Sequence, residues 1–315
     1  MYAVRLQGLT KDFTAGFWRP RPIRVLDGVT LDVEPGEVLG YLGPNGAGKT
    51  TTLKLLMQLI FPTSGGAEIL GRPVGDVDTR RRIGFLPETP CFYDNLTAEE
   101  LLVYYGSLFG FSAADARRRT SQLLDRVGLG AERGHQLRRH SKGMLQRVGI
   151  AQALINDPEV IFLDEPLSGL DPLGRRDIRH LLLSLRDEGR TLFFSSHILS
   201  DAEAVCSRVA ILSRGQLVAS GRVAELGLKV QGWELVIAGI SEVRIRDLDP
   251  SIRKVTIVAD GRYVLELPAD RPPEKLIAEL LRSGAQIISL NPHHETLEEF
   301  FVAQVARQDT EAPCP

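Results

Sequence analysis

The sequence contains few cysteines and no long apolar segment. Cys91, Cys206 and Cys314 lie far apart, and no two of them have the spacing of metal ligands, so we expect reduced thiols in a cytoplasmic protein. No apolar run approaches the roughly 18 to 20 residues that a membrane-spanning helix needs. The N-terminal residues also lack the apolar core of a secretory signal. These absences predict a soluble chain with no membrane span of its own, which reaches a membrane only through a partner.

The sequence also has no large excess of charge of either sign. Its 315 residues include 38 Lys and Arg against 40 Asp and Glu, which gives a formal net charge of -2 at pH 7. This balance argues against a nucleic-acid-binding protein that relies on overall positive charge. The arginines at 117–119 and 138–139 are not accompanied by aromatic residues, so they indicate a solvated helical face rather than a nucleic-acid or lipid surface. We therefore expect no nucleic-acid partner.

What the sequence does have is an alternation of strand and helix patterns as far as about residue 220. Such alternation predicts an α/β fold in which a parallel sheet is covered by helices. Thr97 and Ser112, each with an acidic residue three positions later, have the pattern of helix N-caps. Strands are expected over 37–43, 81–88, 160–164 and 191–197, and helices over 50–59, 98–110, 113–127, 144–155 and 175–188.

The pattern changes near residue 222, where segments that alternate apolar and polar residues begin. Asp260-Gly261 lies between two of these segments and is a hairpin turn signal. This part of the chain therefore favours a small, separate α+β domain. Its expected elements are strands over 254–260, 263–268 and 285–290, a helix over 276–281, and a last helix capped at Thr296.

A glycine-rich segment separates the first apolar strand from a leucine-rich helix. It consists of Gly43, Pro44, Asn45, Gly46, Ala47, Gly48, Lys49, Thr50 and Thr51. Gly-x-x-x-x-Gly-Lys-Thr between a strand and a helix is the pattern of a phosphate-binding loop. Its peptide N–H groups and the helix N-terminus favour a phosphate anion. Lys49 would contact the β- and γ-phosphates of a nucleotide, and the Thr50 hydroxyl would bind Mg²⁺.

A second candidate site follows the apolar run 160–163. Asp164 and Glu165 end this run, 115 residues after Lys49. Asp164 suits the binding of Mg²⁺ through water, and Glu165 suits a general base that activates the attacking water. Acidic corners after strands are common in α/β proteins, so the pair is informative chiefly because a phosphate loop precedes it.

Three further motifs surround this acidic pair. HSKGMLQR begins at His140, LSGLD ends at Asp171, and FFSSH ends at His197. Together with the phosphate loop and the Asp-Glu pair, and in this order, they resemble the motifs of the ATP-binding cassette (ABC) proteins over about the first 220 residues. The chain looks most like the exporter subclass, in which the ATPase and the membrane permease are separate chains.

The resemblance implies a fold and a domain organisation. We expect a P-loop NTPase of the ABC type, with a mixed sheet core, over residues 1–222, and a helical subdomain within it at roughly 90–150. A small α+β accessory domain is expected over 223–306, where it would stabilise a dimer or regulate activity. Residues 307–315 are expected to form a disordered tail.

The resemblance also implies roles for residues beyond the phosphate loop. Ser141 and Gly143 would bind the γ-phosphate of an ATP held by the other subunit of a dimer, although Ser141 alone would simply indicate a helix cap. Asp171 would lie at the contact between subunits. His197 would contact the γ-phosphate and position the attacking water.

An aromatic ring is implied for the adenine base. Phe13 occupies the place where the family stacks such a ring on adenine, and Trp18 is a second candidate for it. Taken alone, Phe13 would indicate core packing instead.

The sequence departs from the family pattern at two places. The signature is usually Leu-Ser-Gly-Gly-Gln, and His140, Lys142 and Met144 replace its leucine, first glycine and glutamine. The serine and the second glycine, which carry the phosphate contacts, are kept. Glu88 stands where the family has a glutamine that reaches Mg²⁺ and the permease. Because a carboxylate also binds Mg²⁺, we expect activity to persist.

The family mechanism implies two partners. Each ATP needs a phosphate loop and a signature from opposite chains, so we expect a second ATPase subunit, with a homodimer as the simplest form. A membrane permease would dock near residues 87–102, which include Phe92 and Tyr93, and would hold the ATPase at the inner face of the cell membrane.

Two other functions are compatible with a cassette sequence. A soluble cassette ATPase acting on ribosomes or DNA would usually carry a second cassette, a long coiled coil or zinc-binding cysteines, and the sequence shows none of these. A regulatory module that binds nucleotide without turnover would not need the intact Lys49, Asp164, Glu165 and His197.

Overall fold

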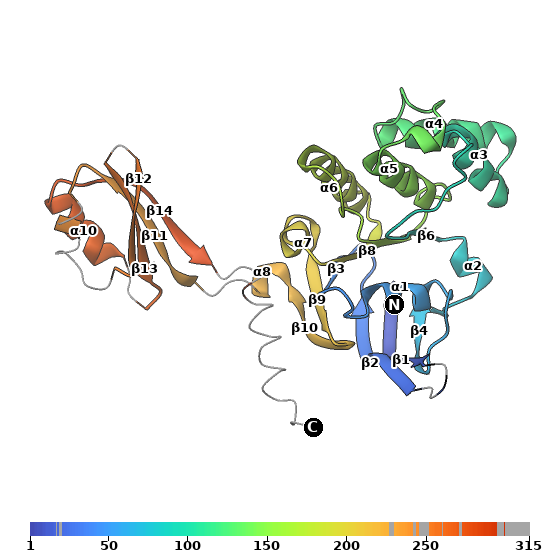
Figure 1. The fold of residues 1–315 in the computed structure, drawn as a ribbon, viewed down its shortest axis with the longest axis horizontal. Coiled ribbons are helices and arrows are strands. Elements are labelled where there is room, and N and C mark those ends of the chain that lie inside the picture. Colours follow the sequence, from blue (N-terminus) through green and yellow to red (C-terminus); the bar gives the residue numbers. More distant parts are fainter. Residues whose placement is uncertain are drawn as a thin grey trace. The chain divides into compact units, whose positions relative to one another are not determined.

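The computed structural model describes residues 1–16, 18, 21–226, 230–241, 244–245, 252–259, 261–270, 273–294 and 299. Contacts between residues divide the chain into two compact units, the first over Met1–Val223 and the second beginning at Ala224. Figure 1 shows the elements of each unit in chain order, from blue to red. No helix among the described residues is long and apolar enough to span a membrane.

A six-stranded sheet forms the centre of the first unit, with the strand order β10-β9-β3-β8-β7-β6. All neighbouring strands are parallel except β9 and β10. β3, β7 and β8 are buried along their whole length and mostly apolar, as expected for a covered parallel sheet, although β8 also contains Thr191, Ser195 and Ser196. The strands are β3 (Val38–Leu42), β6 (Ile83–Leu86), β7 (Val160–Asp164), β8 (Thr191–Ser196), β9 (Arg208–Ser213) and β10 (Gln216–Arg222).

A second, antiparallel sheet gives the first unit its mixed character, with the order β2-β1-β4-β5. Side chains from both sheets and from α1 (Lys49–Leu56) form one core. Tyr41 and Phe162 pack on either side of Phe193, with ring centroids 5.1 and 5.8 Å apart. The strands are β1 (Val4–Ala15), β2 (Arg21–Val33), β4 (Ser64–Ile69) and β5 (Arg72–Pro73). These four strands were not among those expected from the sequence.

Helices α3, α4 and α5 form one group, coloured green in Figure 1. The capping box at Thr97 is present, and the Ser112 hydroxyl accepts a hydrogen bond from the Asp115 amide, so both predicted caps are confirmed. The helices of this unit are α2 (Val77–Arg80), α3 (Ala98–Leu108), α4 (Ala113–Arg126), α5 (Lys142–Ala153), α6 (Pro172–Asp187), α7 (Leu199–Val205) and the 3₁₀ turn η1 (Leu137–Arg139).

Several helix boundaries differ from the expectation by one to three residues, and two of the differences have a local cause. α1 ends at Leu56 rather than residue 59, and Gln58 has a φ of 54°, which a right-handed helix cannot contain. α6 begins at Pro172 rather than residue 175, because the Asp171 side chain caps the helix and proline suits its first turn.

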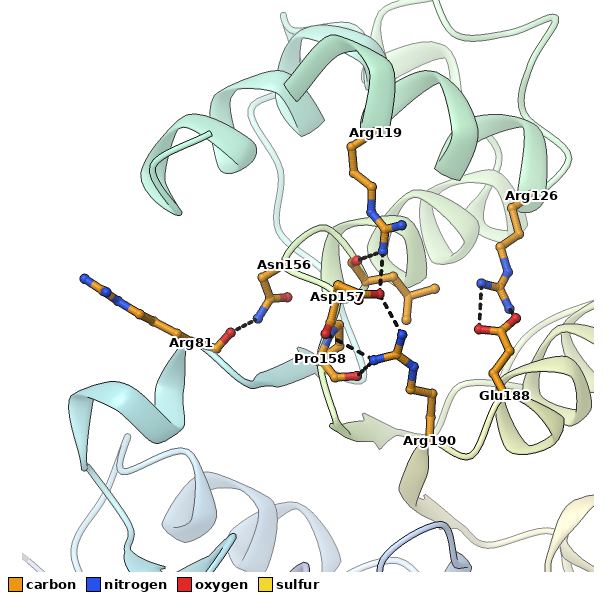
Figure 2. Close-up of polar contacts among 9 residues, drawn as sticks. Arg81, Arg119, Arg126, Asn156, Asp157, Pro158, Glu188 and Arg190 are labelled. Carbon is orange, nitrogen blue, oxygen red and sulfur yellow. Dashed lines mark hydrogen bonds and ion pairs between the residues drawn. The ribbon is translucent and has the colours of Figure 1, made fainter. Parts of the chain in front are cut away.

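Arginine side chains attach this helical group to the rest of the unit (Figure 2). Arg119 of α4 donates to the Leu154 carbonyl at 3.1 Å and to Asp157 Oδ1 at 3.0 Å. Arg190, which precedes β8, donates to the same Asp157 oxygen at 2.7 Å. Arg126 pairs with Glu188 at the end of α6. The turn between α5 and β7 is thereby fixed to both α4 and the start of β8.

The second unit contains an antiparallel sheet of order β12-β13-β11-β14 and a helix, α10. Leu235, Ile237 and Leu265 of the sheet pack with Leu276 and Leu280 of α10. The predicted hairpin is present, since Ala259 pairs with Arg262. The predicted cap at Thr296 and the predicted tail 307–315 lie outside the described residues. α8 (Val223–Leu226) includes the point of the chain where the second unit begins. The other elements are β11 (Val230–Ala238), β12 (Lys254–Ala259), β13 (Arg262–Pro268), α10 (Glu274–Arg282) and β14 (Gln286–His294).

Candidate functional site

The glycine-rich loop joins the end of β3 to the start of α1. Gly46 and Gly48 have φ angles of 81° and 109°, in the left-handed region that favours glycine. Gly43 is needed for a different reason, because a Cβ there would lie 2.3 Å from the Leu212 carbonyl oxygen. No side chain caps α1. The first N–H groups of this helix therefore have no side-chain acceptor and suit a phosphate anion.

Lys49 is buried in this loop, with 6% of its surface exposed. Its Nζ donates to the Gly43 carbonyl at 2.7 Å and to the Pro44 carbonyl at 3.2 Å. The same Nζ lies 3.5 Å from Glu165 Oε1. A buried ammonium needs such partners. They place the lysine between the loop and the acidic end of β7.

Asp164 ends β7 and is 1% exposed. The Thr50 hydroxyl donates to its Oδ1 at 3.2 Å, and the Ser195 hydroxyl donates to the same oxygen at 2.6 Å. Ser195 also accepts a hydrogen bond from the Glu165 amide at 3.0 Å. Ser195 therefore fixes both acidic residues, although its role was not predicted from the sequence. The available signal was a serine in the fully buried β8, directly beside Asp164 in the sheet.

Glu165 holds an unusual backbone conformation, with a φ of 50°. A non-glycine residue in this region is strained, and such strain is common at functional sites. Its side chain is buried between two basic groups, since Oε1 faces Lys49 and Oε2 forms a 2.8 Å hydrogen bond with Nδ1 of His197. The strained turn thus holds one carboxylate between a lysine and a histidine.

Lys49, Thr50 and Glu165 line a cleft of about 420 Å³. Asp164 and His197 are not part of this lining, but they contact Thr50 and Glu165. Glu88 lies at this cleft together with the loop and Glu165, although it comes from the end of a different strand, β6. Val25 of β2 also lines the cleft and was not expected from the sequence. The cleft is lined by Val25, Asn45, Gly46, Gly48, Lys49, Thr50, Thr51, Glu88 and Glu165.

Phe13, the candidate adenine-stacking residue, is not part of this lining. It lies on β1 opposite Ile23 of β2 and is 40% exposed. The ammonium group of Lys11 lies 5.0 Å from the centre of its ring. The second candidate, Trp18, is highly exposed. The ring of Phe13 is therefore accessible to a ligand, at a point two residues along β2 from Val25.

Ser141, Gly143 and Asp171 form a second group outside the cleft lining. Ser141 caps α5 by accepting from the Met144 amide at 3.3 Å, and Asp171 caps α6 by accepting from the Gly174 amide at 3.0 Å. A Cβ added at Gly143 would lie 3.3 Å from the Leu170 side chain. The two helix starts are therefore neighbours.

His140, which replaces the leucine of the usual signature, behaves as an apolar residue. It is buried, and burial is the main reason why its pKa lies below the ordinary 6.5, with the neighbouring His135 adding to the effect. The imidazole is therefore neutral near pH 7. The substitution adds no charge beside Ser141.

Comparison with known proteins identifies the family. Residues 26–168 match the family model described as ABC transporter. An uncharacterized ABC transporter ATP-binding protein of Synechocystis sp. is 45% identical over 299 residues, which cover 94% of this chain and 83% of that protein. The chain belongs to the ABC transporter ATP-binding proteins. It is also similar to the daunorubicin/doxorubicin resistance ATP-binding protein of Streptomyces peucetius, with 33% identity over 96% of this chain and 92% of that one.

A solved structure shows what an ABC ATPase of this kind does. The chain resembles the dimeric, post-hydrolysis structure of an ATP-binding cassette bound to ADP and Pi, with a TM-score of 0.64 and 28% identity. The similarity covers 70% of this chain and 98% of that one. The fold expected from the sequence, an ABC-type P-loop NTPase, is confirmed. The protein is an ATPase and the ATP-binding subunit of a transporter.

The acidic residues of this ABC ATPase also fit a magnesium ion. Mg²⁺ is usually held by one or two carboxylates together with water and substrate phosphates. Within the part of the chain that the structure describes, no group of three or more His, Cys, Asp and Glu side chains could hold a metal by itself. The oxygen donors of Thr50, Asp164 and Glu88, at or beside the phosphate loop, fit an ion that is bound jointly with a nucleotide.

Proposed function

We propose that the chain is the ATP-hydrolysing subunit of a membrane exporter and works as a dimer around two ATP molecules. One observation carries this proposal. The candidate site residues fall into two groups on one chain: Lys49 and Glu165 line the cleft and His197 contacts Glu165, whereas Ser141 lies outside the lining and caps α5. A second copy, which presents its own Ser141 to the cleft, would complete the site.

The contacts at the cleft support a separate role for each of these residues in phosphoryl transfer. Lys49 and the N-terminus of α1 would bind the β- and γ-phosphates of ATP. Thr50 and Asp164, with Glu88, would hold Mg²⁺, which neutralises phosphate charge when it is bound. Phe13 would stack on the adenine ring.

Glu165 would accept a proton from the attacking water as the water oxygen bonds to the γ-phosphorus. The bond between the γ-phosphorus and the bridging oxygen breaks, and the products are ADP and inorganic phosphate. His197 would orient the Glu165 carboxylate through the 2.8 Å contact and bind the γ-phosphate. The buried, strained backbone of Glu165 fixes the position of its carboxylate before the reaction, so that proton transfer would need no large rearrangement.

The second group of residues would act on the ATP of the partner chain. Ser141, Gly143 and the N-terminus of α5 would bind its γ-phosphate, and Asp171 would lie at the contact between subunits. Because these contacts would exist only in the closed dimer, ATP would shift the population toward the closed dimer. Hydrolysis would remove the contacts and allow the dimer to open. We further propose that the second compact unit serves as an accessory domain that stabilises or regulates this dimer.

Export needs a membrane partner, which we propose to be a separate permease that holds this ATPase at the inner face of the cell membrane. The Streptomyces relative is named for drug resistance, which supports export as the direction. A groove of about 340 Å³ beside the Glu88 segment suits a permease loop, because Phe85, Phe92, Tyr105 and Phe109 line it.

The partner can be tested by purification of the tagged chain from detergent-solubilised membranes of its own source. We expect a protein with several membrane-spanning helices to copurify and to change the ATPase rate. The variant Phe92→Asp, which places a charge in the proposed docking groove, is purified in parallel. The membrane protein should be absent from this second preparation. Copurification of ribosomes or DNA in place of a membrane protein would contradict the proposal.

The substitution Glu88→Gln tests the proposed metal contact. A neutral amide binds Mg²⁺ more weakly than a carboxylate, so we expect the Mg²⁺ concentration for half-maximal ATPase activity to rise several-fold. The Kd for ATP without Mg²⁺ should change little. Glu88→Asp, which keeps the charge, is the matched control. Its Mg²⁺ concentration for half-maximal activity should lie between those of Glu88→Gln and the unmodified chain. An unchanged Mg²⁺ dependence would show that Glu88 does not contact the ion.

A further inference from the structure

We propose that Asp201 and Arg179 are positioning residues that couple the subunit contact at Asp171 to the catalytic contact at His197. Asp201 lies in α7, which begins two residues after His197, and Arg179 lies in α6, which begins directly after Asp171. This inference rests on the proposed function, because it assigns His197 to ATP hydrolysis and Asp171 to the dimer.

Asp201 and Arg179 form an ion pair between the two helices. Arg179 Nη2 donates to Asp201 Oδ1 at 2.8 Å. Asp201 is 1% exposed, whereas the Arg179 side chain is 34% exposed. A buried carboxylate is costly unless it is paired, so this contact strongly favours one relative position of α6 and α7.

The pair is not arranged for maximal stability. Among the described residues, Asp201 Oδ2 and the Nε atoms of Arg175 and Arg179 are buried without a hydrogen-bond partner. Each buried polar atom without a partner costs stability, and apolar side chains at these positions would avoid that cost. In the proposal, this cost is the consequence of fixing the position of His197.

The pair lies on a short path between the two functional residues. Asp171 caps α6, the Arg175 amide donates to the Asp171 carbonyl at 2.9 Å, and Arg179 follows one turn later on the same face. A movement of Asp171 in the dimer therefore moves Arg179 with the helix.

At the other end, α7 is fixed to the end of β8, directly before His197. The Ile198 amide donates to the Ser196 hydroxyl at 3.0 Å, and this hydroxyl donates to the Ile198 carbonyl at 3.2 Å. These bonds make the turn between β8 and α7 compact. A displacement of Asp201 is passed to His197 and alters its 2.8 Å contact with Glu165.

A double-mutant cycle tests whether Asp201 acts through His197. Asp201→Asn is expected to lower kcat by about 10- to 100-fold, since small misplacements of catalytic groups have effects of this size, and to leave KM for ATP near its original value. In the His197→Ala background the same substitution should add little, because residues that act as one unit are not additive. Multiplied effects of the two changes would overturn the proposal.

A second variant separates positioning from folding. Arg179→Met combined with Asp201→Asn removes both charges and leaves no lone buried ion, so the protein should fold with nearly unchanged Tm. We expect the kcat of this double variant to stay low. The kcat of the conservative variant Asp201→Glu should lie between that of Asp201→Asn and that of the original protein. A kcat equal to that of the original protein would show that the pair has only a structural role. If His197→Ala alone left turnover unchanged, the proposed function of His197 would be wrong, independently of Asp201.

Discussion

Replacement of Glu165 by glutamine is expected to lower the steady-state ATPase rate by about 10²- to 10⁴-fold, the contribution of a positioned general base. The amide has nearly the same shape as the carboxylate but cannot accept the proton of the attacking water. Lys49 and the phosphate loop are untouched by the change, so ATP should still bind. Phosphate release gives the rate, and fluorescence titration with a labelled ATP gives the Kd.

The control for this substitution is Glu34→Gln, which makes the same change at an exposed residue outside the cleft lining. Its turnover should equal that of the unmodified chain. Turnover of Glu165→Gln at the original rate would exclude Glu165 as the base.

Replacement of Lys49 by alanine is expected to weaken ATP binding by about 2–4 kcal/mol, or roughly 30- to 700-fold in Kd, as for other buried charge pairs that lose one partner. Lys49 is buried and already contacts two loop carbonyls and Glu165. Its loss removes the cation that we propose to bind the phosphates, and it leaves the Glu165 carboxylate without this ion-pair partner. The Kd for ATP, measured by titration, reports the effect.

Lys54→Ala is the matched control, because Lys54 lies on the same helix with an exposed side chain. It should bind ATP as the unmodified chain does. Equal affinities for the two variants would contradict the assignment of the phosphate loop. Thermal unfolding of both variants, measured without nucleotide, separates a binding defect from loss of the fold.

Four of the six strands of the central sheet, β3, β6, β7 and β8, were predicted from the sequence, whereas β9 and β10 were not. β3, β7 and β8 are recognisable because they are buried along their whole length and mostly apolar. The antiparallel sheet was not predicted, since β1 has three register irregularities in its pairing with β2. Such irregularities break the strict alternation by which a half-buried strand is recognised.

The candidate site was predictable where residues follow parallel strands. The phosphate loop, Glu165 and Glu88 follow β3, β7 and β6, whose carboxyl ends meet at one edge of the sheet. Ser195 and the Asp201–Arg179 pair were not predicted. Their contacts depend on the alignment of neighbouring strands and on the packing of α6 against α7, which no local pattern encodes.

The claim that two copies enclose ATP is tested most directly by light scattering of Glu165→Gln with and without ATP and Mg²⁺. We predict the molar mass of a single chain without nucleotide and twice that mass with it. With Ser141→Arg added, the chain should still bind ATP through its own loop but remain single. A single-chain mass of Glu165→Gln at saturating ATP would contradict the claim. A dimer that forms without ATP and persists in the Ser141→Arg variant would contradict it as well.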